Sequence, residues 1–425
     1  MKFNCKYVFW IAPGKFKHFF GNIPAYNCIS YFLELFELHG IEYHIKTIKK
    51  DKADINDVNI FLVPADGIPD REVNNFTYID DFTYQQITGA ALHQKENILW
   101  CYDNQVKVVI DRSRECVPFN IDKMIDWMNS HELIDYSYFR ILINDKNSWS
   151  KHCNNFALNP KYKRLLLDAD FFLFETYGLK NNPLTKDFNM KPMSRKKKYT
   201  FSLLAGEVRK IHRIKTMTGL KSLGLLDNSF YSTVNRYQSY ELQKILAHEI
   251  NVETYNKNYK YRDAFLKYKD ELQIEKRFDS DDNNINLNNI TDRKCPQEIH
   301  ESYFNIVFES NWNTMFYTEK TYKPIICGLP FIILGCSHQN QQISEMGFIP
   351  YNNIFKFEFE EHRAGIDRNR GDKYIEGFIE EIKRVCSEPK EIFSADQIQY
   401  NLNHFEKIAN TKSLMKHIEY TFESW

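Results

Sequence analysis

Three chemically active side chains stand together at Thr318, Glu319 and Lys320. They lie between two apolar runs with the composition of buried strands, YFNIVFES (303–310) and PFIILG (330–335). Thr318 is suited to cap the amino end of a helix, which places the acid and the base in its first turn. Free N–H groups at a helix N-terminus and a lysine beside them attract phosphate, and a nearby carboxylate accepts hydrogen bonds from a ribose. The run therefore indicates a nucleotide site, but a glutamate that favours the helix dipole and a solvated lysine explain it equally well.

The longer segment FNIVFESNWNTMFYTEKTYKPIICGLPFIILG (304–335) resembles the nucleotide-sugar motif of the α1,3-fucosyltransferase family. In that motif a strand ending Phe-Glu-Asn-Ser leads through a short loop to Tyr-x-Thr-Glu-Lys, then to a helix, a glycine and an apolar strand. The matching positions are Phe308, Glu309, Ser310, Phe316, Thr318, Glu319, Lys320, Gly328 and Pro330. The sequence departs from the motif at Ser310 and Asn311, which replace Asn-Ser, and at Pro324, which costs about 3 kcal/mol unless the helix kinks or starts later.

The resemblance implies an inverting glycosyltransferase of the GT-B type. Such an enzyme has two Rossmann-like domains facing across a cleft, with the nucleoside diphosphate sugar, GDP- or UDP-linked, in the C-terminal one. It implies that Lys320 contacts the diphosphate and Glu319 the ribose, with no metal required. The rest of the implied donor site is Glu309, Ser310, Asn311 and Thr318. Fixed cations in a site from which water is excluded would stabilise the departing nucleoside diphosphate.

A second cation is expected after the strand that opens the same domain. In SLLAGEVRKIHRIKTMTGL, Arg209 and Arg213 are spaced so that they share one face of a helix. The fucosyltransferase resemblance implies a phosphate-binding arginine at this place. Arg213 is the preferred equivalent and Arg209 the alternative, and a solvated basic helix start is the other interpretation.

An inverting transferase also needs a base that takes the proton of the attacking hydroxyl. Glu115, in VKVVIDRSRECVP (106–118), loosely resembles the Glu-Ser-Pro stretch from which the family draws its proposed base. Asp66, directly after the apolar run IFLVPAD, is the rival candidate. Either acid is also explained as a solvated loop residue.

Two other classes of protein stay open. Asp168 and Asp170 form an Asp-x-Asp after an apolar run, and in metal-dependent GT-A transferases such a pair holds Mn²⁺ or Mg²⁺ on the donor diphosphate. The pattern is short and common by chance, and the phosphate-type motif lies far downstream in another domain. A nucleic-acid or glycan reader without turnover is the remaining alternative.

The acceptor is expected to be a hydroxyl of a glycan or another small molecule. The chain also resembles proteins of tailed phages in its Asn-, Lys-, Ile- and Tyr-rich composition and in the segment TEKTYKPI. Tailed phages glycosylate hydroxymethylated bases in their own DNA. For that DNA alternative, the basic run Arg195, Lys196, Lys197 and Lys198 would supply phosphate contacts. A solvated linker explains the same run.

Composition sets the broad class. The 425 residues exceed what one hydrophobic core usually fills, and 56 basic against 56 acidic residues argue against a surface that binds nucleic acid throughout. The apolar run before Pro13 is too short for a signal sequence, and no segment approaches the roughly 20 apolar residues of a membrane helix. Nine scattered cysteines without a CxxC pair suit reduced thiols. We therefore expect a cytoplasmic protein without integral membrane contact, in the host cytoplasm if the source is viral.

Apolar runs that alternate with helical patterns predict parallel sheets covered on both faces, and hence an α/β fold. The runs are 7–13, 41–48, 58–67, 97–103 and 106–111, then 198–206, 303–310 and 330–335. A polar, basic segment at 184–200 is the expected linker. We predict an N-terminal acceptor-side domain over 1–190, a C-terminal nucleotide-sugar domain over 191–394, and a helix within 395–425 that packs back on the first domain.

Overall fold

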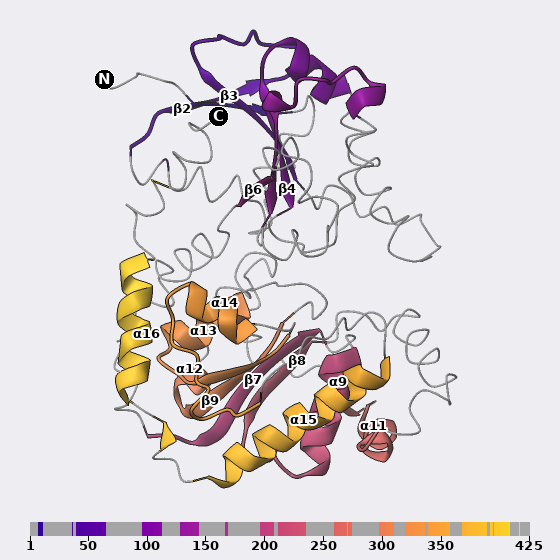
Figure 1. Cartoon of the computed structure of the whole chain (residues 1–425), viewed down its shortest axis with the longest axis vertical. Helices are drawn as coiled ribbons and strands as arrows, with labels where there is room; N and C mark the ends of the chain where they lie inside the picture. The colour runs from indigo at the N-terminus through magenta and orange to yellow at the C-terminus, as the bar shows by residue number, and fades with distance from the viewer. Residues whose placement is uncertain are drawn as a thin grey trace, which may run out of the picture. The chain divides into compact units, whose positions relative to one another are not determined.

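The computed structural model of the chain forms two compact units, one made of residues 1–174 with 410–425 and the other of residues 175–409 (Figure 1). The structure describes residues 7–11, 36, 40–64, 96–112, 128–143, 166–168, 196–207, 211–234, 259–269, 271–273, 297–309, 319–335, 339–357, 368–388, 392–393, 395–408 and 416. Each unit contains its own parallel sheet. The predicted α/β class with two Rossmann-like units is thereby confirmed, and their arrangement across a cleft stays a prediction.

The first unit is built on a six-stranded sheet in the order β2-β1-β3-β4-β5-β6, and every neighbouring pair is parallel. The strands are β1 (Tyr7–Ile11), β2 (Tyr43–Thr47), β3 (Val58–Pro64), β4 (Lys107–Arg112), β5 (Phe139–Ile143) and β6 (Leu166–Asp168), with a short 3-10 helix η1 (Tyr136–Tyr138) before β5. Isoleucine, valine and leucine are the most frequent residues of these strands, as expected for a sheet covered on both faces.

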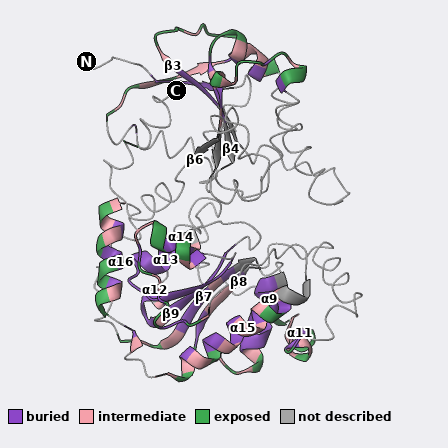
Figure 2. Cartoon of the chain, in the orientation of Figure 1, coloured by how far each residue is buried: buried purple, intermediate pink, exposed green. Residues whose placement is uncertain are grey.

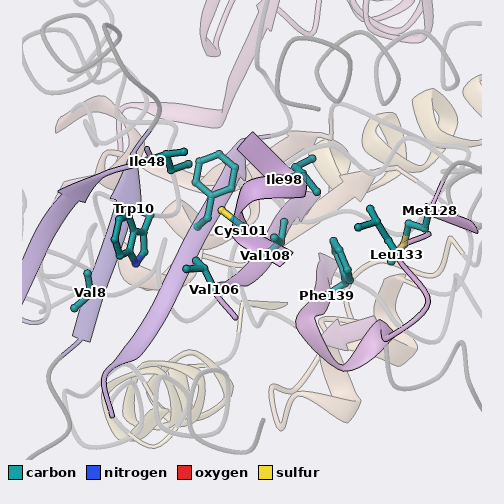
Figure 3. Packing of buried hydrophobic residues seen from close by; sticks show 11 residues of the cluster. Val8, Trp10, Ile48, Ile98, Cys101, Val106, Val108, Met128, Leu133 and Phe139 are labelled. Atoms are coloured by element: carbon teal, nitrogen blue, oxygen red, sulfur yellow. The ribbon is translucent and has the colours of Figure 1, made fainter. Parts of the chain in front are cut away.

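The core of this unit gathers beside the central strands (Figure 3). Val8 and Trp10 of β1, Val108 of β4 and Phe139 of β5 are all buried in it. The indole Nε1 of Trp10 donates a hydrogen bond of 2.9 Å to Oδ1 of Asn59, so the one polar atom of this ring is satisfied.

The prediction of an extended apolar run at 97–103 was wrong, because residues 96–103 are helical. Ile98 and Cys101 are its buried residues, and their spacing places both on one face of a helix. Val106 and Val108 then continue the core into β4. A short apolar run does not distinguish a buried strand from a buried helix, which explains the error.

The second unit is built on a four-stranded parallel sheet in the order β10-β9-β7-β8. Its strands are β7 (Tyr199–Glu207), β8 (Phe230–Val234), β9 (Ser302–Phe308) and β10 (Phe331–Leu334). Its helices are α9 (Ile211–Ser222), α11 (Arg262–Tyr268), η3 (Glu271–Gln273), α12 (Gln297–His300), α13 (Glu319–Ile326), α14 (Gln339–Glu345), α15 (Arg368–Ser387) and α16 (Ala395–Ile408). Figure 2 shows that buried residues follow β9 and the inner sides of α9 and α15.

Predicted strands in this unit are confirmed at 198–206, 303–310 and 330–335, within one or two residues. The prediction missed β8, and β7 begins inside the segment expected to be a linker. The helix expected near the C-terminus is α16, which packs on α13 within the second unit. The division of the chain falls at residue 174, and the predicted domain bounds of 1–190, 191–394 and 395–425 stay predictions.

Among the described residues, no helix combines the length and the apolarity needed to cross a membrane.

Candidate functional site

The order of strands in the second sheet places a topological switch point between β7 and β9. From β7 the chain passes through α9 to β8 on one side, and from β9 it passes through α13 to β10 on the other. The two connections therefore diverge at the carboxyl ends of β7 and β9. Open α/β sheets bind their ligands at such a place. The candidate site is the edge formed by the ends of these two strands and the first turns of α9 and α13.

Arg213 lies in the first turn of α9 and joins the two central strands. Its Nη1 donates a hydrogen bond of 2.8 Å to the carbonyl oxygen of Ala205 in β7, and its Nη2 donates one of 3.2 Å to that of Phe308 in β9. The residue is only 2% exposed. The structure thus brings Arg213 to the predicted edge, with its guanidinium bound to backbone.

Glu309 follows β9 directly and is fully buried, in contact with both helices of the site. Its Oε1 accepts a hydrogen bond of 2.5 Å from Oγ1 of Thr321 in α13. Its carbonyl oxygen lies 3.3 Å from Nε2 of His212 in α9, and since a carbonyl only accepts, Nε2 carries the proton. Glu309 therefore connects α9 to α13 across the end of β9.

The helix α13 begins at Glu319, which confirms the prediction that Glu319 and Lys320 occupy a first helical turn. Pro324 lies inside this helix, and the helix ends two residues after it. Gly328 then adopts φ of 61°, with hydrogen bonds from Gly328 N to Ile325 O (3.1 Å) and from Leu329 N to Pro324 O (2.8 Å). This is a Schellman cap, so the glycine of the sequence motif has a structural role.

Two lysines of α13 supply positive charge near this edge. Lys320 is half-buried, and Lys323, one turn further along, is only 5% exposed. Lys323 was not among the predicted site residues, although its spacing of three residues from Lys320 places the two lysines on neighbouring positions of one helix face. Among the described residues, none forms an ion pair or hydrogen bond with the Lys323 ammonium group. The Lys323 side chain is mostly buried, but its Nζ is not one of the fully buried polar atoms that lack a hydrogen-bond partner, so the ammonium group keeps access to solvent and can meet an anionic ligand.

Packing of α9 against α15 fixes the helix that carries Arg213. Lys215 Nζ and Asp372 Oδ1 form a buried ion pair of 2.8 Å, and the ammonium lies 5.3 Å from the ring centroid of Tyr259. Gly219 permits a close approach, because a Cβ there would lie 2.4 Å from Cδ1 of Ile379. These contacts fix the position of α9 relative to α15.

Several predicted site residues lie outside the described part of the chain. They are Asp66, Glu115, Asp170, Arg195, Arg209, Ser310, Asn311 and Thr318. The backbone of Asp168 ends β6, in the first unit. In the part of the chain that the structure describes, no group of three or more His, Cys, Asp or Glu side chains is placed to hold a metal ion.

The described lysines of the basic run lie before β7, at the amino edge of the sheet and away from the switch point. Lys196 is exposed, while Lys197 Nζ donates to the carbonyl oxygen of His300 at 2.9 Å. Lys198 forms an ion pair of 2.9 Å with Glu301, and its hydrogen bond to that carboxylate raises the pKa of Lys198. These contacts attach the entry of β7 to the end of α12.

No protein-family model matches the sequence, and a search of curated proteins finds no match. A search of solved structures finds the crystal structure of an alpha1,3-fucosyltransferase, at 10% sequence identity and a TM-score of 0.32. The alignment covers 99% of this chain and 90% of that chain. A likeness at this TM-score is too weak to assign chemistry to individual residues.

Proposed function

We propose that the chain is a glycosyltransferase that transfers a sugar, with inversion, from a nucleoside diphosphate sugar to an acceptor hydroxyl. The observation that carries this proposal is the start of α13, with Glu319 and Lys320, downstream of a strand that is followed by buried Glu309 at the switch point. Parallel sheets bind nucleotides at this edge, and the residues there match the fucosyltransferase-like motif of the sequence.

In the proposed complex, Lys320 and Lys323 neutralise the diphosphate and Glu319 accepts hydrogen bonds from the ribose. The leaving group is a nucleoside diphosphate whose negative charge grows as the glycosidic bond breaks. Fixed cations near that charge lower the barrier because they are already oriented before reaction. The two lysines supply this charge without a metal ion, and the nucleotide is GDP or UDP.

For the acceptor we propose a glycan or another small hydroxyl compound bound by the first unit, with Glu115 or Asp66 as the general base. The attacking hydroxyl loses its proton to the base while its oxygen forms a bond to the anomeric carbon, and the bond from that carbon to the diphosphate oxygen breaks. Because Lys197 and Lys198 contact the end of α12, the basic run does not favour a DNA acceptor.

The test is a transfer assay with labelled GDP- and UDP-sugars in the presence of EDTA. The acceptors are a set of oligosaccharides and a duplex that contains hydroxymethylcytosine. Label transfer to an oligosaccharide is the expected result. Transfer only to the duplex would replace the acceptor proposal, and neither hydrolysis nor transfer of any donor would contradict the enzyme class.

A further inference from the structure

The ends of parallel strands leave backbone carbonyls that have no further strand neighbour, and buried carbonyls need donors. At the switch point the donors come from two consecutive residues of α9. Arg213 donates hydrogen bonds to the carbonyl oxygens of Ala205 and Phe308, and His212 donates one to the carbonyl oxygen of Glu309. The first turn of α9 therefore joins β7, two residues before its end, to the last residue of β9.

The guanidinium is well suited to this task because its N–H groups form a rigid fork that can serve two acceptors at once. Its hydrogen bonds are charge-assisted, and such bonds are stronger than those between neutral groups. With Arg213 almost wholly buried, the side chain is oriented by the two strand ends and by the packing of α9. A lysine at this position would keep the charge but not the fork.

The contacts continue from β9 to α13. Glu309 directly follows Phe308, whose carbonyl Arg213 holds, and the Glu309 carboxylate accepts the hydroxyl of Thr321. Thr321 is the residue after Lys320 in the first turn of α13. The position of that turn therefore depends on where β9 ends, and Arg213 fixes the end of β9 relative to β7.

We infer that Arg213 is a positioning residue, which ties β7 to β9 and thereby sets the first turn of α13, and that it does not contact the diphosphate itself. This inference rests on the proposed function for its effect on the ligand. The tie between the strands itself is independent of any ligand. The two roles differ in their consequences, because a phosphate contact affects only phosphate-bearing ligands, whereas a displaced strand end affects every ligand bound at that edge.

The experiment compares Arg213→Met, Arg213→Lys and Lys320→Met with the unaltered full-length protein. Titration with GDP and UDP, and with guanosine and uridine, gives the loss of affinity with and without phosphate. We expect Arg213→Met to weaken nucleoside and nucleoside diphosphate by a similar factor, about tenfold. Lys320→Met should weaken only the diphosphate. A loss in Arg213→Met that is confined to the diphosphate, with full recovery in Arg213→Lys, would overturn the inference.

A second measurement needs no ligand. Amide hydrogen exchange of peptides that cover 302–309 and 319–327 should be faster in both Arg213 variants and unchanged in Lys320→Met, because only the Arg213 variants release the strand ends. Unchanged exchange in both Arg213 variants would also overturn the inference. If the unaltered protein binds no nucleotide, the proposed function fails, while the exchange result still decides whether Arg213 ties the strands.

Discussion

Thr321 Oγ1 donates a hydrogen bond of 2.5 Å to Glu309 Oε1, and both residues are fully buried. The bond joins the first turn of α13 to the end of β9. Among the described residues, this hydrogen bond links the Glu309 carboxylate to α13, and the carboxylate has no exposed surface with which to bind water in its place. This hydrogen bond therefore helps to hold the first turn of α13, which carries the proposed diphosphate site, at the end of β9.

Thr321→Val should lower the free energy of unfolding by about 1–3 kcal/mol, because it leaves a buried carboxylate without this donor. Thr321→Ser keeps the hydroxyl and should stay close to the unaltered protein, which makes it the matched control. Urea unfolding measures both. Equal stabilities for the valine and serine variants would show that the hydroxyl contributes nothing.

Lys323→Met should have opposite effects on stability and on binding. Replacing the ammonium of this largely buried side chain with an apolar group should raise the free energy of unfolding by up to about 1 kcal/mol. The same change should weaken binding of GDP or UDP by about tenfold, because a charge near the diphosphate is lost. Lys373→Met, at an exposed position of α15, is the control and should change neither quantity. Full affinity in Lys323→Met would remove Lys323 from the proposed site.

The buried ion pair of Lys215 and Asp372 allows a double-mutant cycle. Asp372→Leu alone should destabilise the second unit by about 3–5 kcal/mol, because it leaves a buried ammonium without its carboxylate. The double variant Lys215→Met with Asp372→Leu should recover most of that loss, since apolar side chains of similar volume often replace such a pair without cost. Additive losses in the cycle would show that the pair is not coupled.

Tyr259 predicts a loss of stability at alkaline pH. Burial, and then the nearby carboxylates of Asp372 and Glu376, raise the pKa of Tyr259 well above its ordinary value. Below about pH 10 both the folded and the unfolded states keep the phenol protonated. Above that pH the unfolded state loses its proton first, so the free energy of unfolding falls as the pH rises further.

Tyr259→Phe should therefore begin less stable at neutral pH, because the hydrogen bond of 3.1 Å to the carbonyl oxygen of Lys215 is lost, but should lose less stability between pH 9.5 and about 11. Tyr400→Phe, at an exposed position of α16, controls for the substitution itself. Parallel stability curves for the unaltered protein and Tyr259→Phe would contradict this assignment.

Much of the fold was predictable because its strands are near-continuous apolar runs of a parallel sheet. The helix over 96–103 was mistaken for an extended run, since Ile98 and Cys101 read as apolar without regard to period. The strand β8 was missed because Tyr231, Ser232 and Thr233 dilute its apolar character. Whether such a run forms a strand or a helix is decided by tertiary packing, which the periodicity of the sequence does not reveal.

The candidate site was predictable where local sequence determines it. Glu319 and Lys320 were placed in a first helical turn from a cap residue and a motif, and the structure confirms that turn. The hydrogen-bond acceptors of Arg213 were not predictable, because the carbonyl oxygens of Ala205 and Phe308 come together only when β7 and β9 pair in the folded sheet. Lys323 was missed for a similar reason, since its burial follows from how α13 packs and not from its neighbours in sequence.

The most direct test of the central claim is calorimetric titration of GDP and UDP into the unaltered protein and into Lys320→Met, at matched ionic strength and with EDTA present. The claim predicts that one of the two nucleotides binds the unaltered protein and that the affinity falls by about tenfold or more in Lys320→Met, without a change in stability. Equal affinity in the two proteins, or no binding of either nucleotide, would contradict a diphosphate site at the start of α13.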